Sequence, residues 1–152
     1  MAANLLSRDV VRRAQIPRRL GLASGEGKGR SVPREFVIAV VDDDDSFRLA
    51  LAESLCSLGY GAREFASAEE FIAEDDEEAC DCVITDVRMP GMSGLELGHL
   101  IASRQSPVPV IMVTALRERG LERAAAKDSF CLLNKPVGTD ALIECLQRAL
   151  EG

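Results

Sequence analysis

The chain is 152 residues long, 47% of them hydrophobic, and its 25 acidic and 18 basic residues give a formal net charge of −7. This length supports one domain with an adequate hydrophobic core. No apolar run reaches the roughly 18 residues that a membrane-spanning helix needs. No apolar stretch resembles the core of a signal peptide either. We therefore expect a soluble, cytoplasmic protein without a membrane partner.

The charge is divided unevenly along the chain. Residues 1–34 carry eight basic and two acidic residues, a net of +6, whereas residues 35–152 carry a net of −13. The first segment also contains the glycine-rich run 21–30, which has the composition of a linker. We predict a basic, disordered tail over 1–34 and a single folded domain over 35–152. A transit peptide and an arm attracted to phosphate groups stay open as alternatives for the tail.

The cysteines and the single histidine limit the metal chemistry. The cysteines are odd in number and include no Cys-x-x-Cys pair, so the spacing of a zinc site is missing. His99 is the only histidine, which argues against a metal cluster or a catalytic dyad built on histidine. We predict that all five cysteines are reduced and act mostly as small buried apolar residues, namely Cys56, Cys80, Cys82, Cys131 and Cys145.

From Glu35 onward, short apolar runs alternate with segments of helical periodicity. Ser67 with Glu70, and Ser93 with Glu96, have the spacing of helix capping boxes. The predicted strands cover 36–41, 60–65, 82–85, 107–113 and 130–133, and the predicted helices cover 46–58, 67–73, the segment after Ser93, 117–127 and 139–150. Five such units predict an α/β fold with one five-stranded parallel sheet, doubly wound by right-handed crossovers.

Polar side chains follow four of the predicted strands, namely Asp42 and Asp43, Asp86, Thr114, and Lys135. The carboxyl ends of parallel strands share one edge of the sheet, where open α/β folds bind their ligands. Each residue alone has an ordinary explanation as a helix cap, a turn residue or a solvated lysine. No comparable set of polar residues stands at the opposite ends of the strands, so we interpret these side chains as the lining of one pocket.

The residue types in this pocket suit phosphoryl chemistry. A cluster of carboxylates is costly unless a cation neutralises it, and ligands that offer only oxygen favour Mg²⁺. A carboxylate that attacks a phosphoryl group needs its own charge and the incoming charge neutralised, and a metal ion with a lysine ammonium supplies that. The hydroxyl of Thr114 can bond a phosphoryl oxygen. Aspartyl phosphate is a known form of carboxylate nucleophilic catalysis.

These residues stand in runs that resemble the receiver domain of two-component response regulators, which has a CheY-like, flavodoxin-like fold. The resemblance covers essentially all of residues 36–152. It is closest to receivers attached to LuxR-type regulators of nitrogen fixation and nodulation. The runs are Val41-Asp42-Asp43-Asp44-Asp45-Ser46-Phe47-Arg48, Thr85-Asp86-Val87-Arg88-Met89-Pro90-Gly91-Met92-Ser93-Gly94, Val113-Thr114-Ala115 and Asn134-Lys135-Pro136, of which the second is the most specific.

The resemblance implies a phosphoacceptor and a magnesium site. Asp86 would be the residue that becomes phosphorylated. Asp43 would bind Mg²⁺ directly and Asp42 largely through water. Asp86 itself and the backbone carbonyl of Arg88 would complete the metal shell.

The resemblance also implies two residues that bind the phosphoryl group, Thr114 and Lys135, and a cis peptide between Lys135 and Pro136. The chain departs from the family on the output face. Receivers usually carry tyrosine or phenylalanine three residues before the lysine, where this chain has Leu132, and Phe130 lies two residues earlier. The stretch from Thr114 to Lys135 also looks one residue short. The departures leave the phosphorylation chemistry intact but put the usual threonine–aromatic switch in doubt.

As a member of that family, the chain would be a stand-alone receiver and a phosphoprotein of a bacterial two-component system. It would accept a phosphoryl group on Asp86 from a sensor histidine kinase or a phosphotransfer protein in a Mg²⁺-dependent reaction. It would catalyse only its own modification and so would not be an enzyme. The output would be binding of a downstream protein, or a homodimer through the face of the fourth helix and fifth strand. We expect no DNA-binding domain in the chain.

Two alternatives accompany this interpretation. Leu132 favours an atypical receiver that acts as an interaction module independently of phosphorylation. A Mg²⁺-dependent phosphatase of the haloacid-dehalogenase kind also uses an aspartyl nucleophile. In this chain, however, Arg88 occupies the position of that family's general acid, which argues against the phosphatase.

Overall fold

A computed structural model of the protein describes residues 35–74, 79–105, 107–115, 120, 123 and 130–151. The elements are β1 (Val37–Val41), α3 (Asp45–Ser57), β2 (Gly61–Phe65), α4 (Ala68–Ala73), β3 (Cys82–Asp86), α5 (Gly94–Ala102), β4 (Val110–Thr114), β5 (Cys131–Asn134) and α7 (Thr139–Glu151). The strands form one parallel sheet in the order β2-β1-β3-β4-β5. The predicted α/β fold with a five-stranded parallel sheet is confirmed.

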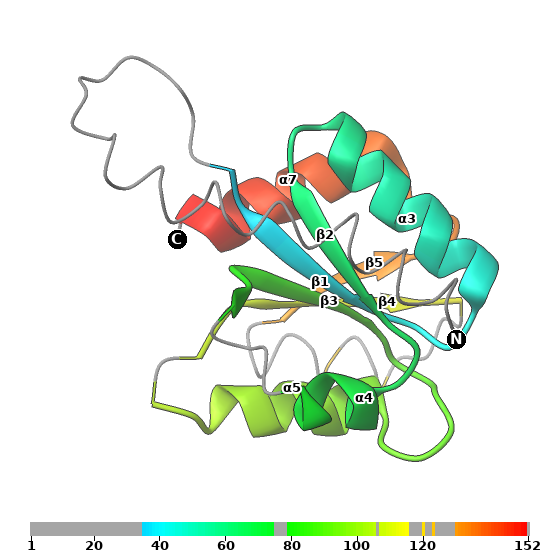
Figure 1. The fold of residues 1–152 in the computed structure, drawn as a ribbon, viewed down its shortest axis with the longest axis vertical. Coiled ribbons are helices and arrows are strands. Elements are labelled where there is room, and N and C mark those ends of the chain that lie inside the picture. The colour runs from blue at the N-terminus through cyan, green and yellow to red at the C-terminus, as the bar shows by residue number, and fades with distance from the viewer. Residues whose placement is uncertain are drawn as a thin grey trace.

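Helices cover both faces of the sheet (Figure 1). Successive side chains of β1 point to opposite faces of the sheet, as they do in any β-strand. Ile38 therefore packs with Leu55 of α3 and Leu146 of α7, whereas Val37 packs in the cluster that contains Leu97 of α5. Burial on both faces is why β1, β3 and β4 appear in the sequence as nearly continuous apolar runs.

Helix caps fix where several of these elements begin. Asp44 caps α3 by accepting a hydrogen bond from the Phe47 N–H at 3.2 Å, so this helix begins at Asp45, one residue before the predicted start. Ser93 and Glu96 form the predicted capping box. Ser67 caps α4 as predicted, but Glu70 accepts a hydrogen bond from the N–H of Ala66 at 2.7 Å.

The predicted start of the fourth strand is wrong. We expected the strand to begin at Pro107, but β4 begins at Val110. Proline has no N–H to donate to a strand ladder. The carbonyl of Pro109 still accepts a hydrogen bond from the Val83 N–H at 3.0 Å, so the chain approaches β3 before the regular pairing starts.

Two predictions fall outside the described residues. The tail expected over 1–34 is one, and with it the proposed domain boundary. The helix expected over 117–127 is the other, since Gly120 and Arg123 are its only described residues. Among the described helices, none is both long and apolar enough to cross a membrane.

The prediction that all five cysteines are reduced is wrong for two of them. Cys131 of β5 and Cys145 of α7 form a disulfide, whereas Cys56, Cys80 and Cys82 take part in no disulfide. The two bonded residues lie 14 positions apart, and they meet because α7 packs over the face of the sheet to which Cys131 points. Sequence spacing alone carries no information on that packing.

We expect reduction of this disulfide to lower the free energy of unfolding by up to about 3 kcal/mol, the entropic value for closing a loop of this length in the unfolded chain. Urea unfolding followed by circular dichroism, with and without dithiothreitol, measures the difference. A Cys56→Ser variant should respond to the reductant as the natural chain does, because Cys56 takes part in no disulfide. Alkylation of all five cysteines in unreduced, unfolded protein would contradict the bond.

Candidate functional site

Three carboxylates meet at the carboxyl edge of the sheet. Asp42 directly follows β1 and Asp86 is the last residue of β3, and the pairing of Val41 with Thr85 sets these two strand ends side by side. One carboxylate oxygen from each of Asp42, Asp43 and Asp86 lies within 4.8 Å of the others. The register of two parallel strands therefore brings together residues that are 44 positions apart in the sequence.

Lys135 reaches the same pocket from the end of β5. Its Nζ lies 3.0 Å from Oδ2 of Asp42 and 3.7 Å from Oδ2 of Asp86. The peptide between Lys135 and Pro136 is cis, as predicted, and the Lys135 N–H donates to the carbonyl of Thr114 at 2.8 Å. The ammonium also lies 4.2 Å from the centre of the Phe47 ring, a cation–π contact from the first turn of α3.

The predicted site residues differ in exposure. Asp42 and Thr114 are each 1% exposed, whereas Asp43 and Arg88 are exposed on the loops that follow β1 and β3. Oδ1 of Asp42 accepts a hydrogen bond from the Asp44 N–H at 2.8 Å. Its Oδ2 is buried and accepts no hydrogen bond of good geometry within the described part of the chain, although it faces the Lys135 ammonium. The pocket is thus buried at its base and open at Asp43.

The electrostatics of the pocket favour a neutralising cation. Burial, together with the charges of Asp42 and Asp43, raises the pKa of Asp86 to about 6, although the charge of Lys135 and a backbone hydrogen bond from Val87 oppose the rise. Burial alone would lower the pKa of Lys135, but contact with Asp42 and the charges of the aspartates outweigh burial and raise it. A single ammonium therefore does not compensate all the negative charge that the strands bring together.

The donor set fits Mg²⁺. It consists of carboxylate oxygens from Asp42, Asp43 and Asp86 within a few ångströms, with an open side at Asp43. Hard divalent cations bind through oxygen, and Mg²⁺ in particular uses one or two carboxylates and keeps several waters. These three residues would hold the ion, and the loop carrying Arg88 lies next to them in sequence.

Close packing holds the loop that follows Asp86. The Gly94 N–H donates to the carbonyl of Val87 at 2.8 Å, and a Cβ added at Gly94 would lie 2.1 Å from the carbonyl oxygen of Asp86. Glu69 of α4 accepts a hydrogen bond from the Met92 N–H at 2.8 Å, which lowers the pKa of Glu69. These contacts anchor the loop to α4 and α5.

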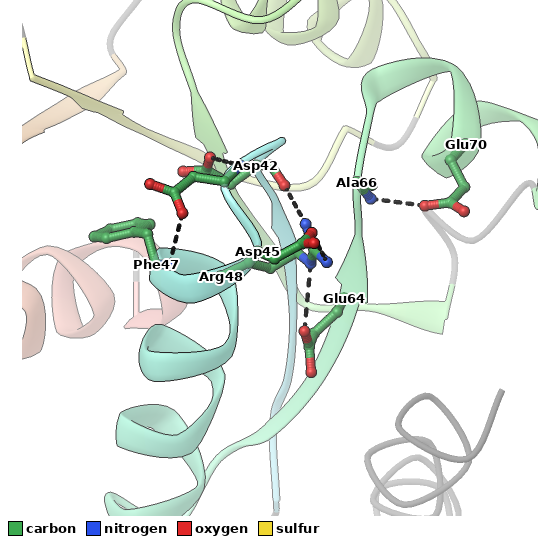
Figure 2. Close-up of polar contacts among 8 residues, drawn as sticks. Asp42, Asp45, Phe47, Arg48, Glu64, Ala66 and Glu70 are labelled. Carbon is green, nitrogen blue, oxygen red and sulfur yellow. Dashed lines mark hydrogen bonds and ion pairs between the residues drawn. The ribbon is translucent and has the colours of Figure 1, made fainter. Parts of the chain in front are cut away.

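Sequence reasoning missed three residues around the pocket: Phe47 against Lys135, Glu69 against the β3–α5 loop, and Arg48 beside Asp42. Figure 2 shows Arg48 reaching from α3 toward Asp42, Asp45 and Glu64. Phe47 and Arg48 belong to the run from Val41 to Arg48 that carries part of the family resemblance, so their proximity in sequence to the acidic residues was a usable signal. Glu69 gave none, because its partner Met92 lies 23 positions away.

In metal-free protein we expect ionisation of Asp86 to destabilise the fold. Its pKa in the folded state, about 6, lies above the ordinary value of 3.8, so the folded state binds more protons than the unfolded state between these values. The free energy of unfolding should therefore fall as pH rises from about 4 to about 6. An Asp86→Asn variant should be more stable than the natural chain at pH 7.5 by on the order of 1–3 kcal/mol.

Urea unfolding in the presence of a chelator, at pH 4 and at pH 7.5, measures this effect. At pH 4 the two proteins should differ much less, because Asp86 is protonated in the folded natural chain. A stability gain of Asp86→Asn that is the same at both values would contradict the raised pKa.

Comparison with known proteins agrees with this geometry. The family model described as "Response regulator receiver domain" matches residues 38–147. The transcriptional regulatory protein FixJ of Bradyrhizobium diazoefficiens is 34% identical over 114 residues, which cover 74% of this chain and 56% of FixJ. The chain spans about half the length of this relative and of the response regulator protein TmoT of Ectopseudomonas mendocina.

Solved structures give the same result. The chemotaxis protein CheY4 of Vibrio cholerae is 27% identical with a TM-score of 0.67, covering 76% of this chain and 99% of CheY4. The BeF3-activated receiver domain of DrrB, a protein of Thermotoga maritima, is 30% identical with a TM-score of 0.68, covering 78% of this chain and 99% of that domain. From the family match and these likenesses, the chain belongs to the receiver domains of two-component response regulators.

Proposed function

We propose that the chain accepts a phosphoryl group on Asp86 from a histidine kinase or a phosphotransfer protein, in a reaction that depends on Mg²⁺. The observation that carries this proposal is the convergence of Asp86 with Asp42, Asp43 and Lys135 at one edge of the sheet. Membership of the receiver family supports it. The domain catalyses its own modification and turns over no separate substrate.

The transfer is a displacement at phosphorus. An ionised Oδ of Asp86 forms a bond to phosphorus while the bond from phosphorus to the donor atom breaks, and the electron pair of that bond stays with the donor. Charge neutralisation of the carboxylates and the phosphoryl oxygens is the chemistry that a bound Mg²⁺ supplies. In the phosphorylated form the Lys135 ammonium donates a hydrogen bond to one phosphoryl oxygen, and the Thr114 hydroxyl donates to a second phosphoryl oxygen.

The arrangement of Lys135 supports this role. Its Nζ is already 3.7 Å from Oδ2 of Asp86, and contacts with the Phe47 ring and with Oδ2 of Asp42 restrict the position of the ammonium group. A preorganised cation costs little reorganisation when negative charge develops beside it. An ammonium held in this way stabilises the phosphorylated form once phosphorylation has converted the singly charged carboxylate into a more negative group.

We expect Asp86→Asn to abolish phosphorylation, because the amide is not a nucleophile for phosphorus under these conditions. Incubation with Mg²⁺ and acetyl phosphate followed by intact-mass spectrometry should detect one added phosphoryl group in the natural chain and none in the variant. Asp140→Asn is a matched control, since Asp140 is an exposed carboxylate in the first turn of α7. A chelator should prevent labelling. Undiminished labelling of Asp86→Asn would remove Asp86 as the acceptor.

A second candidate function is an interaction module that does not depend on phosphorylation. Leu132 favours it, since this residue packs partly buried against the core cluster on the α5 face and stands where related receivers carry an aromatic ring. The pocket is compatible with both functions, because binding of a phosphoryl group and its readout are separate steps.

Beryllofluoride, which activates the receiver domain of DrrB, separates the two candidates. Under the first proposal, beryllofluoride with Mg²⁺ shifts the backbone amide resonances of β5 as well as those of Asp43 and Asp86, and changes binding of a partner or the oligomeric state. Resonance shifts that stop at the pocket, with an unchanged oligomeric state, would favour the second. An absence of any shift would contradict the first proposal itself.

A further inference from the structure

Arg48 lies beside the acidic loop (Asp42–Asp44), and three different nitrogens of its guanidinium donate hydrogen bonds to three different acceptors. Its Nη1 donates to the backbone carbonyl of Asp42 at 2.6 Å, its Nη2 to Oδ1 of Asp45 at 2.6 Å, and its Nε to Oε1 of Glu64 at 3.3 Å (Figure 2). The Arg48 side chain is only 12% exposed and that of Glu64 10%. A planar guanidinium has its donors in a fixed fork, so three simultaneous bonds define its position closely.

These contacts restrain the peptide that joins Asp42 to Asp43. The carbonyl of Asp42 is held by Arg48, and its N–H donates to the carbonyl of Phe65 at 3.0 Å. The Asp42 side chain is held in turn by the Asp44 N–H. The backbone on both sides of the Asp42 side chain is therefore bonded to groups on β2 or α3.

Asp43 depends on this restraint more than Asp42 does. The Asp43 carboxylate is exposed, and it has no hydrogen bond to any residue in the described part of the chain. Its direction toward Asp86 is consequently set by the backbone that precedes it. Because Arg48 bonds the carbonyl of the Asp42–Asp43 peptide, it acts on the carboxylate that the proposed function assigns to direct metal binding.

The positive charge of Arg48 and its restraint of the metal ligands would have opposite effects on the affinity for Mg²⁺. A guanidinium close to a cation site repels the cation, so its charge alone would weaken binding of Mg²⁺. Restraint of the ligands would strengthen binding, since outer residues that orient metal ligands are typically worth about 10–100-fold in metal affinity. The sign of the change on removing Arg48 therefore distinguishes the two effects.

We propose that Arg48 is a positioning residue of the phosphoacceptor site, which orients Asp42 and Asp43 for Mg²⁺ through the carbonyl of their shared peptide. This inference rests on the proposed function, because it takes Mg²⁺ as the ion of the pocket. Glu64 assists by anchoring the guanidinium to β2, which ties the acidic loop to two elements of the fold.

The test compares Arg48→Gln with Arg148→Gln, which removes the same charge from an arginine that is 70% exposed on α7. We expect the dissociation constant for Mg²⁺, measured by calorimetry, to rise about tenfold in Arg48→Gln and to stay unchanged in Arg148→Gln. Arg48→Lys, which keeps the charge but offers one nitrogen, should also bind Mg²⁺ more weakly than the natural chain. Tighter or equal binding in Arg48→Gln, or full affinity in Arg48→Lys, would overturn the proposal.

Two further measurements keep the inference separate from folding and from the proposed function. If Arg48→Gln unfolds, Glu64→Gln replaces it, with a smaller rise in the dissociation constant expected, and unchanged affinity would overturn the proposal. In metal-free protein, the backbone order parameters of Asp43 and Asp44 should fall in Arg48→Gln and not in Arg148→Gln. A natural chain that binds no Mg²⁺ would overturn the proposed metal, whereas unchanged order parameters would overturn the positioning role alone.

Discussion

Crowding of negative charge at the carboxyl edge of the sheet is the constraint on which the site depends. The pairing of β1 with β3 leaves Asp42 beside Asp86, and the burial of the pocket base removes water that would screen them. Like charges in a partly buried pocket raise the free energy of the folded state unless a cation or a proton compensates them. The raised pKa of Asp86 and the position of Lys135 are two consequences of this one constraint.

The surrounding fold keeps the carboxylates close in spite of their repulsion. β1 and β3 are paired neighbours in the interior of the sheet, and each is held on its other side by β2 or β4, so their ends cannot separate without breaking the ladder between them. The loop after β1 is held through Arg48, and the loop after β3 through Gly94 and Glu69. The stability of the sheet thus offsets the electrostatic cost of the pocket, and under the proposed function the same rigidity keeps the pocket ready for an incoming phosphoryl group.

Much of this arrangement could be predicted from the sequence because it depends on local patterns. Buried strands appear as apolar runs, and the first residues beyond them must lie at the sheet edge, which brought Asp42, Asp86 and Lys135 into one predicted pocket. Contacts that depend on how elements pack could not be predicted. The bond between Cys131 and Cys145 needs α7 to lie over β5, and the contact of Arg48 with Glu64 needs α3 to lie beside β2. Residue spacing in the sequence carries no information on either contact.

Phe130 cannot take the place of the aromatic residue that Leu132 replaces. Thr114 pairs with Asn134 and Met112 with Leu132, so Phe130 lies four residues from the level of Thr114, roughly 13 Å along the strand. Its ring instead packs toward Gly98 of α5, where an added Cβ would lie 3.0 Å from its Cζ. At the level of Thr114 the backbones of the two strands are joined, since the N–H of Lys135, one residue beyond β5, donates to the Thr114 carbonyl at 2.8 Å. Under the proposed function, a change at Asp86 would therefore reach β5 through this backbone pairing, and an aromatic side chain is not needed for that step.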